Sequence, residues 1–121
     1  MAEATFSGPM LRLNTMAVVV RDEKKAAKWY HEKLGLQVKD RFPHWHTMVA
    51  KGSKFRLHLC PDSKPEKGNT GIAFASDDVA KEEKALRKKG VRITVPTTKE
   101  DWGTYLMFAD PDGNEFYVFG D

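Results

Sequence analysis

Hydrophobic and polar positions along the chain follow two patterns, which occur in the same order twice. An apolar run at 16–20 (MAVVV) precedes a charged stretch at 23–33 whose apolar residues recur at helical spacing. A second apolar run at 72–75 (IAFA) precedes another charged stretch at 81–89. Each pair predicts a strand followed by an amphipathic helix, and the continuous apolar runs predict strands covered on both faces.

The two halves of the chain form an internal repeat. Residues 18–42 align with residues 73–97 without a gap, so that Gly35 coincides with Gly90. Both glycines stand where a helix C-terminus favours a residue that tolerates positive φ. The predicted N-caps are Asp22 in the first copy and one of Ser76, Asp77 and Asp78 in the second.

Strand-like stretches continue after each predicted helix. They cover residues 37–42, 44–50 and 55–60 in the first half and residues 92–97, 104–109 and 115–120 in the second. The segments 51–54 (KGSK) and 110–114 (DPDGN) carry turn residues between the last two strands of each set.

These elements predict one α+β domain over residues 1–121, built from paired βαβββ modules. The modules cover residues 12–60 and 71–120, and the polar segment 61–70, with two prolines and a glycine, is the predicted linker. We expect a helix on one face of each curved mixed sheet. The uncovered faces, related by a pseudo-two-fold, are expected to turn toward a shared cleft.

Alternation along the strands predicts which side chains reach that cleft. In the strand 55–60 we expect Phe55, Leu57 and Leu59 to pack on a helix, while Arg56, His58 and Cys60 face the cleft. In the strand 115–120 we expect Phe116 and Val118 to be buried, while Glu115, Tyr117 and Phe119 face the cleft.

Composition and charge narrow the classes of partner. The 20 Lys and Arg against 17 Asp and Glu give a net charge of +3, and the two signs alternate as they do on solvated helix faces. No basic block is interleaved with aromatic residues, so we expect no nucleic-acid partner. The single cysteine, Cys60, and the absence of a signal-like or membrane-length apolar run predict a cytoplasmic protein without a membrane partner.

Three segments carry a family resemblance. The passage VVVRDEKKAAKWYHEKLGL (18–36) resembles the opening motif of the vicinal oxygen chelate superfamily, which includes glyoxalase I, bleomycin-resistance proteins and extradiol dioxygenases. GIAFASDDV (71–79) is similar to the middle motif of that family, and WGTYLMFADPDGNEFYVF (102–119) to its closing motif. The resemblance implies the fold predicted above. It does not imply one activity, because this scaffold carries unrelated chemistries.

The resemblance also implies where a metal site would lie. Members that use a metal place one ligand on each of four strands, commonly His or Gln, Glu, His and Glu. The matching positions here are Thr15, His58, Gly71 and Tyr117. Glycine has no side chain, threonine is a poor ligand, and tyrosine ionises only near pH ~10. We therefore expect no metal and no other cofactor.

Histidines supply the remaining candidates for chemistry. If the turn at 51–54 contains three residues, His46 lies opposite His58, and if it contains two, Thr47 does. His44 is then an exposed strand-edge residue. His58 is the candidate catalytic residue because an imidazole in a partly apolar cleft can serve as an acid or base, and it can equally be a polar anchor without chemistry.

Aromatic residues give the expected cleft its character. Tyr105 and Tyr117 fall on the uncovered face, and Trp45 or Trp102 lies near its rim. Flat rings stack on planar ligands. The candidate ligand-binding residues are accordingly Thr15, His46, His58, Gly71, Tyr105 and Tyr117.

Two functions follow from these features. The first is a metal-independent protein of the bleomycin-resistance type that holds a planar or aromatic small molecule. The alternative is a glyoxalase-like lyase or isomerase acting on a small oxygenated metabolite, with His58 as acid or base. The resemblance further implies a homodimer, in which modules of both chains often build the cleft.

Overall fold

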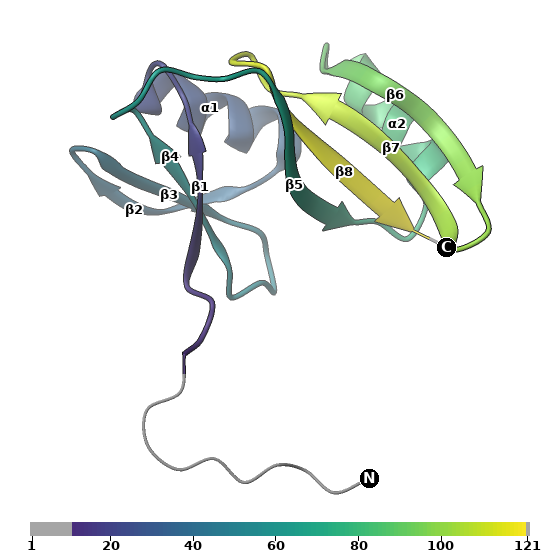
Figure 1. The fold of residues 1–121 in the computed structure, drawn as a ribbon, viewed down its shortest axis with the longest axis horizontal. Helices are drawn as coiled ribbons and strands as arrows, with labels where there is room; N and C mark the ends of the chain where they lie inside the picture. Colours follow the sequence, from purple (N-terminus) through teal and green to yellow (C-terminus); the bar gives the residue numbers. More distant parts are fainter. Residues whose placement is uncertain (1–10, 121) are drawn as a thin grey trace, which may run out of the picture.

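The computed structural model describes residues 11–120 (Figure 1). The first module contains β1 (Thr15–Val19), α1 (Glu23–Leu34), β2 (Gln37–Phe42), β3 (Trp45–Val49) and β4 (Arg56–Cys60). The second contains β5 (Gly68–Ala75), α2 (Val79–Lys88), β6 (Arg92–Glu100), β7 (Gly103–Ala109) and β8 (Asn114–Gly120).

The strands form two mixed four-stranded sheets, with the orders β1-β4-β3-β2 and β5-β8-β7-β6. In each sheet the first strand of the module pairs in parallel with the last, and the other pairs are antiparallel. Figure 1 shows each helix lying behind the strands of its own module. The predicted α+β architecture of paired βαβββ modules is confirmed.

Helix boundaries follow from capping. The Asp22 carboxylate accepts hydrogen bonds from the backbone N–H groups of Lys24 and Lys25, both at 3.0 Å, and Gly35 ends α1 with φ of 74°. These bonds lower the pKa of Asp22, that from Lys25 most. In the second module the N-cap is Asp78, whose carboxylate accepts from the Lys81 N–H.

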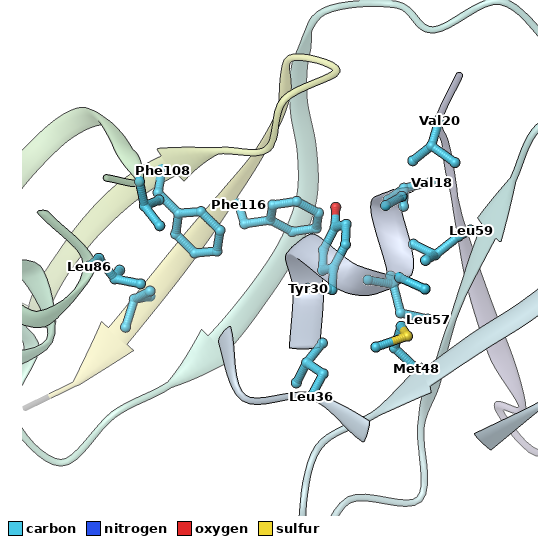
Figure 2. Close-up of a cluster of buried hydrophobic side chains, with 14 of the residues drawn as sticks. Val18, Val20, Tyr30, Leu36, Met48, Leu57, Leu59, Leu86, Phe108 and Phe116 are labelled. Atoms are coloured by element: carbon cyan, nitrogen blue, oxygen red, sulfur yellow. The ribbon is translucent and has the colours of Figure 1, made fainter. Parts of the chain in front are cut away.

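One hydrophobic core joins the two modules on their helix-covered sides. Its residues come from both helices and both sheets. Figure 2 shows Tyr30 of α1 standing between Phe116 of β8 and a group of aliphatic side chains from β1 and β4. The Tyr30 and Phe116 rings meet edge to face at 6.1 Å between centroids. The helix-covered face of one module is therefore packed against that of the other.

Several expectations from the sequence need correction. The apolar runs in β1 and β5 are covered on one face only, since Ala17, Ala73 and Ala75 are exposed. Phe55 does not pack on a helix: it precedes β4, where no ladder fixes its direction, and it is 49% exposed. The strand β5 begins at Gly68, inside the segment predicted as linker.

The junction of the modules contains a buried polar network. The Tyr30 hydroxyl donates a 2.6 Å hydrogen bond to Oδ2 of Asp110, which begins the turn before β8. The Asn114 side-chain amide donates to the same carboxylate oxygen and to the carbonyl of Val19, at 2.8 and 2.9 Å. Burial, and after it the charge of Asp110, raises the pKa of Tyr30 well above its ordinary value, so the hydroxyl remains a donor.

Substituting Tyr30→Phe should lower the free energy of unfolding by about 1.5–3 kcal/mol, because the ring packing stays while a buried carboxylate loses a donor. Urea denaturation followed by circular dichroism measures the change. Tyr105→Phe is the matched control on the open side of the second sheet and should shift stability by less than about 0.5 kcal/mol. Equal stabilities for Tyr30→Phe and the wild type would contradict the assigned role of the network.

Candidate functional site

The open face of the second sheet carries a cluster of four aromatic rings, which we call the aromatic platform: Trp102, Tyr105, Tyr117 and Phe119. Within the platform, the centroids of neighbouring rings lie 5.0 to 6.1 Å apart. The spacing follows from the ladder, because Tyr105 pairs with Phe119 across β7 and β8, and Tyr117 alternates to the same face. As predicted, Phe116 and Val118 are buried while the odd-numbered residues of β8 face outward.

Small residues of β5 extend the platform on its other side. Ala73 pairs with Tyr117, and Ala75 pairs with Phe119. Both alanines are exposed, so at the positions paired with Tyr117 and Phe119 the side chain of β5 is only a methyl group. Trp102 is 62% exposed and Phe119 37% exposed, which leaves the ring surfaces accessible.

Gly71 and Asn69 form a bulge at the start of β5. The ladder between β5 and β8 shifts register between Asn69 and Ala73, and Gly71 adopts φ of 76° there. A side chain at this position would be strained although the space around it is open. The Asn69 side chain accepts a hydrogen bond from the Gly71 N–H and donates one to the Tyr117 hydroxyl at 2.9 Å.

The open face of the first sheet presents His58 and Trp45. Their rings lie 4.2 Å apart, and Nε2–H of His58 donates a 3.0 Å hydrogen bond to the carbonyl of His44. Arg56 and Cys60 project from the same face of β4, as alternation predicts, while Leu57 and Leu59 are buried beneath α1. Thr15 lies at the edge of this face, paired with Arg56.

His46 does not lie on the open face. In the ladder between β3 and β4, Thr47 pairs with His58 and His46 pairs with Leu59, so the register is the one in which Thr47 lies opposite His58. His46 points under α1, where it is 5% exposed and its Nδ1 lies 3.1 Å from Oε2 of Glu23. The expectation of His46 in the cleft wall is wrong, because the register differs by one residue.

The six predicted site residues thus fall into separate groups. Tyr105, Tyr117 and Gly71 lie on the second sheet, Thr15 and His58 on the open face of the first, and His46 on its covered face. Of four cavities within residues 11–120, none is lined by both His58 and Tyr117. None of these four cavities therefore joins His58 and Tyr117 across the open faces of the two sheets.

The donors at the four positions that the resemblance assigns to a metal do not fit one. Nε2 of His58 is engaged as a hydrogen-bond donor, and the Tyr117 hydroxyl accepts from Asn69. Gly71 offers no side chain. Across residues 11–120, no three His, Cys, Asp or Glu side chains approach closely enough to hold an ion.

The sequence predicts Tyr105 and Tyr117 on the uncovered face and Trp45 or Trp102 near its rim, but it does not point to Asn69. Asn69 could not be predicted because its neighbours in the sequence are polar and typical of a linker. Its contact with Tyr117 depends on the pairing of β5 with β8. The contact of Trp45 with His58 was equally hidden, since it depends on the register of β3.

Comparison with protein families identifies this architecture. Residues 12–118 match the model of the Glyoxalase/Bleomycin resistance protein/Dioxygenase superfamily. The chain belongs to this superfamily. Like the resemblance in its motifs, this membership of the glyoxalase/bleomycin resistance superfamily establishes the fold and leaves the activity open. Neither helix within residues 11–120 is both long and apolar enough to cross a membrane.

Individual members of the superfamily are similar over nearly the whole chain. The uncharacterized protein YetH of Bacillus subtilis is 28% identical over 115 residues, covering 88% of this chain and 96% of YetH. TnmS3, an antibiotic-binding protein from a Streptomyces species, is 27% identical with a TM-score of 0.83, covering 94% of this chain and 98% of TnmS3. A member from Sphaerobacter thermophilus is 27% identical with a TM-score of 0.82, covering 93% of this chain and 98% of that one.

The turn that holds His58 is fastened by a second histidine. His44 adopts a positive φ of 61°, and its imidazole hydrogen-bonds to the carboxylate of Asp62. That bond, and next to it the charge of Asp62, raises the pKa of His44 above its ordinary value. A raised folded-state pKa stabilises the fold fully below the unfolded pKa of about 6.5, and the stabilisation is lost as pH rises through the folded value.

We expect Asp62→Asn to lower the pKa of His44 toward about 6.5, measured by NMR titration of the imidazole protons. The stability gap between the wild type and Asp62→Asn should shrink as pH rises through the pKa of His44. Asp101→Asn, an exposed carboxylate in the turn before β7, serves as control and should leave the His44 titration unchanged. A His44 pKa unaffected by Asp62→Asn would rule out this ion pair in solution.

Proposed function

We propose that this protein binds a planar or aromatic small molecule on the aromatic platform, without a metal and without a covalent step. The observation that carries the proposal is the set of four accessible rings beside the exposed Ala73 and Ala75. Beside Tyr117 and Phe119, the paired positions Ala73 and Ala75 present only methyl groups to a flat ligand. Stacked aromatic pairs contribute ~0.5–1.5 kcal/mol each beyond the burial of their area.

A hydrogen bond orients the polar edge of the platform. Because Asn69 donates to the Tyr117 oxygen, the hydroxyl proton of Tyr117 is free to donate to an acceptor on a ligand. The site thus combines flat apolar contact with one directional polar group, as small-molecule sites commonly do. The antibiotic binding of TnmS3, whose fold this chain shares closely, is consistent with such a role.

A second copy of the chain completes the proposed site. A ligand lying on an open sheet face has protein on one side only, whereas binding sites usually bury most of a ligand's surface. The first sheet presents its own open face, with the 38% exposed Trp45 over His58. We propose a homodimer in which this face of one protomer covers the platform of its partner, in the cytoplasm, where the lone Cys60 stays reduced.

Removing one ring of the platform should weaken binding of planar ligands. We expect Tyr117→Ala and Trp102→Ala each to raise the Kd by about 2- to 12-fold, the equivalent of one stacked pair. Fluorescence quenching by a panel of planar aromatic compounds, among them acridine orange and anthraquinone-2-sulfonate, measures the affinity. Lys84→Ala, an exposed position on α2 and on neither open sheet face, is the control and should bind like the wild type. A flat response to the whole panel would count against the proposal.

The alternative, a glyoxalase-like lyase or isomerase, requires His58 to act as acid or base. Its ring contacts Trp45 at a tilted angle and donates to a backbone carbonyl, and the tyrosine donors lie on the other sheet. These contacts favour an anchoring role for His58.

Zinc titration separates the two functions. By calorimetry we expect no stoichiometric Zn²⁺ binding to the wild type, since the donors around His58 do not complete a coordination shell. His58→Ala should still bind planar ligands. Its zinc titration should be the same as that of the wild type, because neither protein is expected to bind zinc stoichiometrically. Stoichiometric zinc that disappears in His58→Ala would overturn metal independence and support the enzyme.

A further inference from the structure

A cavity of about 770 Å³ lies on the helix-covered side of the first sheet, between α1 and the hairpin of β2 and β3. We call it the α1 cavity. Its lining residues are Glu23, Lys24, Ala27, Lys28, His31, Val38, Arg41, Pro43 and His46. Apart from His46 it shares no residue with the predicted site, and it shares none with the aromatic platform.

The helix wall of the α1 cavity is one stripe of α1. Lys24, Ala27, Lys28 and His31 follow the spacing that brings residues onto one helix face. Buried Ala27 supplies apolar surface between the exposed lysines. Nδ1–H of His31 donates to the carbonyl of Leu36 at 2.8 Å, which fixes the orientation of the ring. Nε2, the other ring nitrogen, takes no part in this bond.

A β-bulge aims Arg41 at the same cavity. Val38 pairs with Met48, but the next pair is Asp40 with Thr47, so Lys39 is the extra residue. Without the bulge Arg41 would alternate to the open face, and with it Arg41 pairs with His46 on the helix side. Bulges that re-aim a side chain are frequent next to functional sites.

His46 and Glu23 form the floor of the cavity. The side chains are 6% and 16% exposed, and Nδ1 of His46 lies 3.1 Å from Oε2 of Glu23. Neither atom has a hydrogen bond, because the two do not meet at hydrogen-bonding geometry. A buried polar atom without a hydrogen bond lowers the stability of the fold. The other Glu23 oxygen accepts from the His44 N–H at 3.2 Å.

The charges around the α1 cavity favour an anion. Lys24, Lys28 and Arg41 bring three permanent positive charges against the single carboxylate of Glu23. Lys28 also lies 3.9 Å from Glu32, but this pair is exposed and therefore weak. Guanidinium and ammonium groups converging beside apolar Ala27, Val38 and Pro43 suit a charged head group on a short apolar body.

We propose that the α1 cavity is a second small-molecule site, which binds an organic anion carrying a carboxylate or phosphate group. Arg41 and Lys28 hold the anionic group, and Ala27, Val38 and Pro43 contact the apolar body. His46 and Glu23 close the floor beneath the bound anion. The site is independent of the aromatic platform, which lies on the other module.

Titrations of ¹⁵N-labelled full-length protein with benzoate and phenyl phosphate test the site. Shifts should saturate at residues 24–31 and 38–46 below about 10 mM, a range that covers weak small-molecule sites. Benzamide, which has the same ring without the charge, should produce no saturable shift. Benzoate and phenyl phosphate together distinguish a carboxylate site from a phosphate site, and saturation by either one supports the proposal.

Two surface variants make the test specific. Arg41→Gln and Lys28→Gln should each weaken binding by about fivefold or more, because each removes a charge-assisted contact. Lys81→Gln, in the first turn of α2, is the matched control and should leave the Kd unchanged. Both substituted side chains are exposed, so the variants should fold even if a change at His46 does not.

Three outcomes would overturn the proposal. One is the absence of saturable shifts with either anion. Another is equal binding of benzamide, or of inorganic phosphate alone, which would show that the charge or the apolar body plays no part. The third is an equal loss of affinity in Lys81→Gln, which would indicate a diffuse attraction to surface lysines. Variants of Tyr117 should leave this binding intact, so failure here is distinguishable from failure of the aromatic platform.

Discussion

The hydrogen bond from Tyr30 to Asp110 constrains the rest of the structure. It connects the middle of α1 to the turn before β8, and Asn114, the first residue of β8, donates to the carbonyl of Val19 at the end of β1. The carboxylate of Asp110 is buried, and a buried carboxylate without hydrogen-bond donors is strongly destabilising. The bond therefore holds the two modules with their helix-covered faces together.

That arrangement determines which surfaces remain free. With both helices directed into one core, the opposite faces of both sheets stay open, and large aromatic side chains lie on them. Phe119 and Trp45 are more than one-third exposed, although each stands in a regular strand. Accessible rings grouped on a sheet face are typical of an interaction site. The core that stabilises the fold and the surface available for a ligand are thus two sides of the same sheets.

Local chemistry allowed much of the fold to be predicted from the sequence. Asp22, Gly35 and the DPDGN turn each satisfy a geometric need within a few residues, so their roles follow from residue type. The burial of Phe116 and Val118 follows from alternation in the same way. The superfamily motifs contain these same residues, and the family match confirms that they occur together on one scaffold.

The site was less predictable because it depends on pairing between distant strands. A difference of one residue in the register of β3 against β4 places His46 on the covered face and not on the open one. The bulges at Lys39 and near Gly71 insert extra residues that no local pattern marks, and they redirect Arg41 and place Asn69 beside Tyr117. Tertiary packing selects among such registers, so composition and periodicity leave them open.

The residue that links the two sides of the first sheet is His44. Its N–H donates to Glu23 at the floor of the α1 cavity, and its carbonyl accepts from His58 on the open face. A single peptide segment with positive φ, fastened by Asp62, therefore contacts the groups proposed for both surfaces. Shortening or replacing this turn would alter both sides of the sheet together, because neither His58 nor Glu23 has another backbone partner among these contacts. The conformation of two residues, Pro43 and His44, thereby sets the geometry of two surfaces that alternation alone would keep apart.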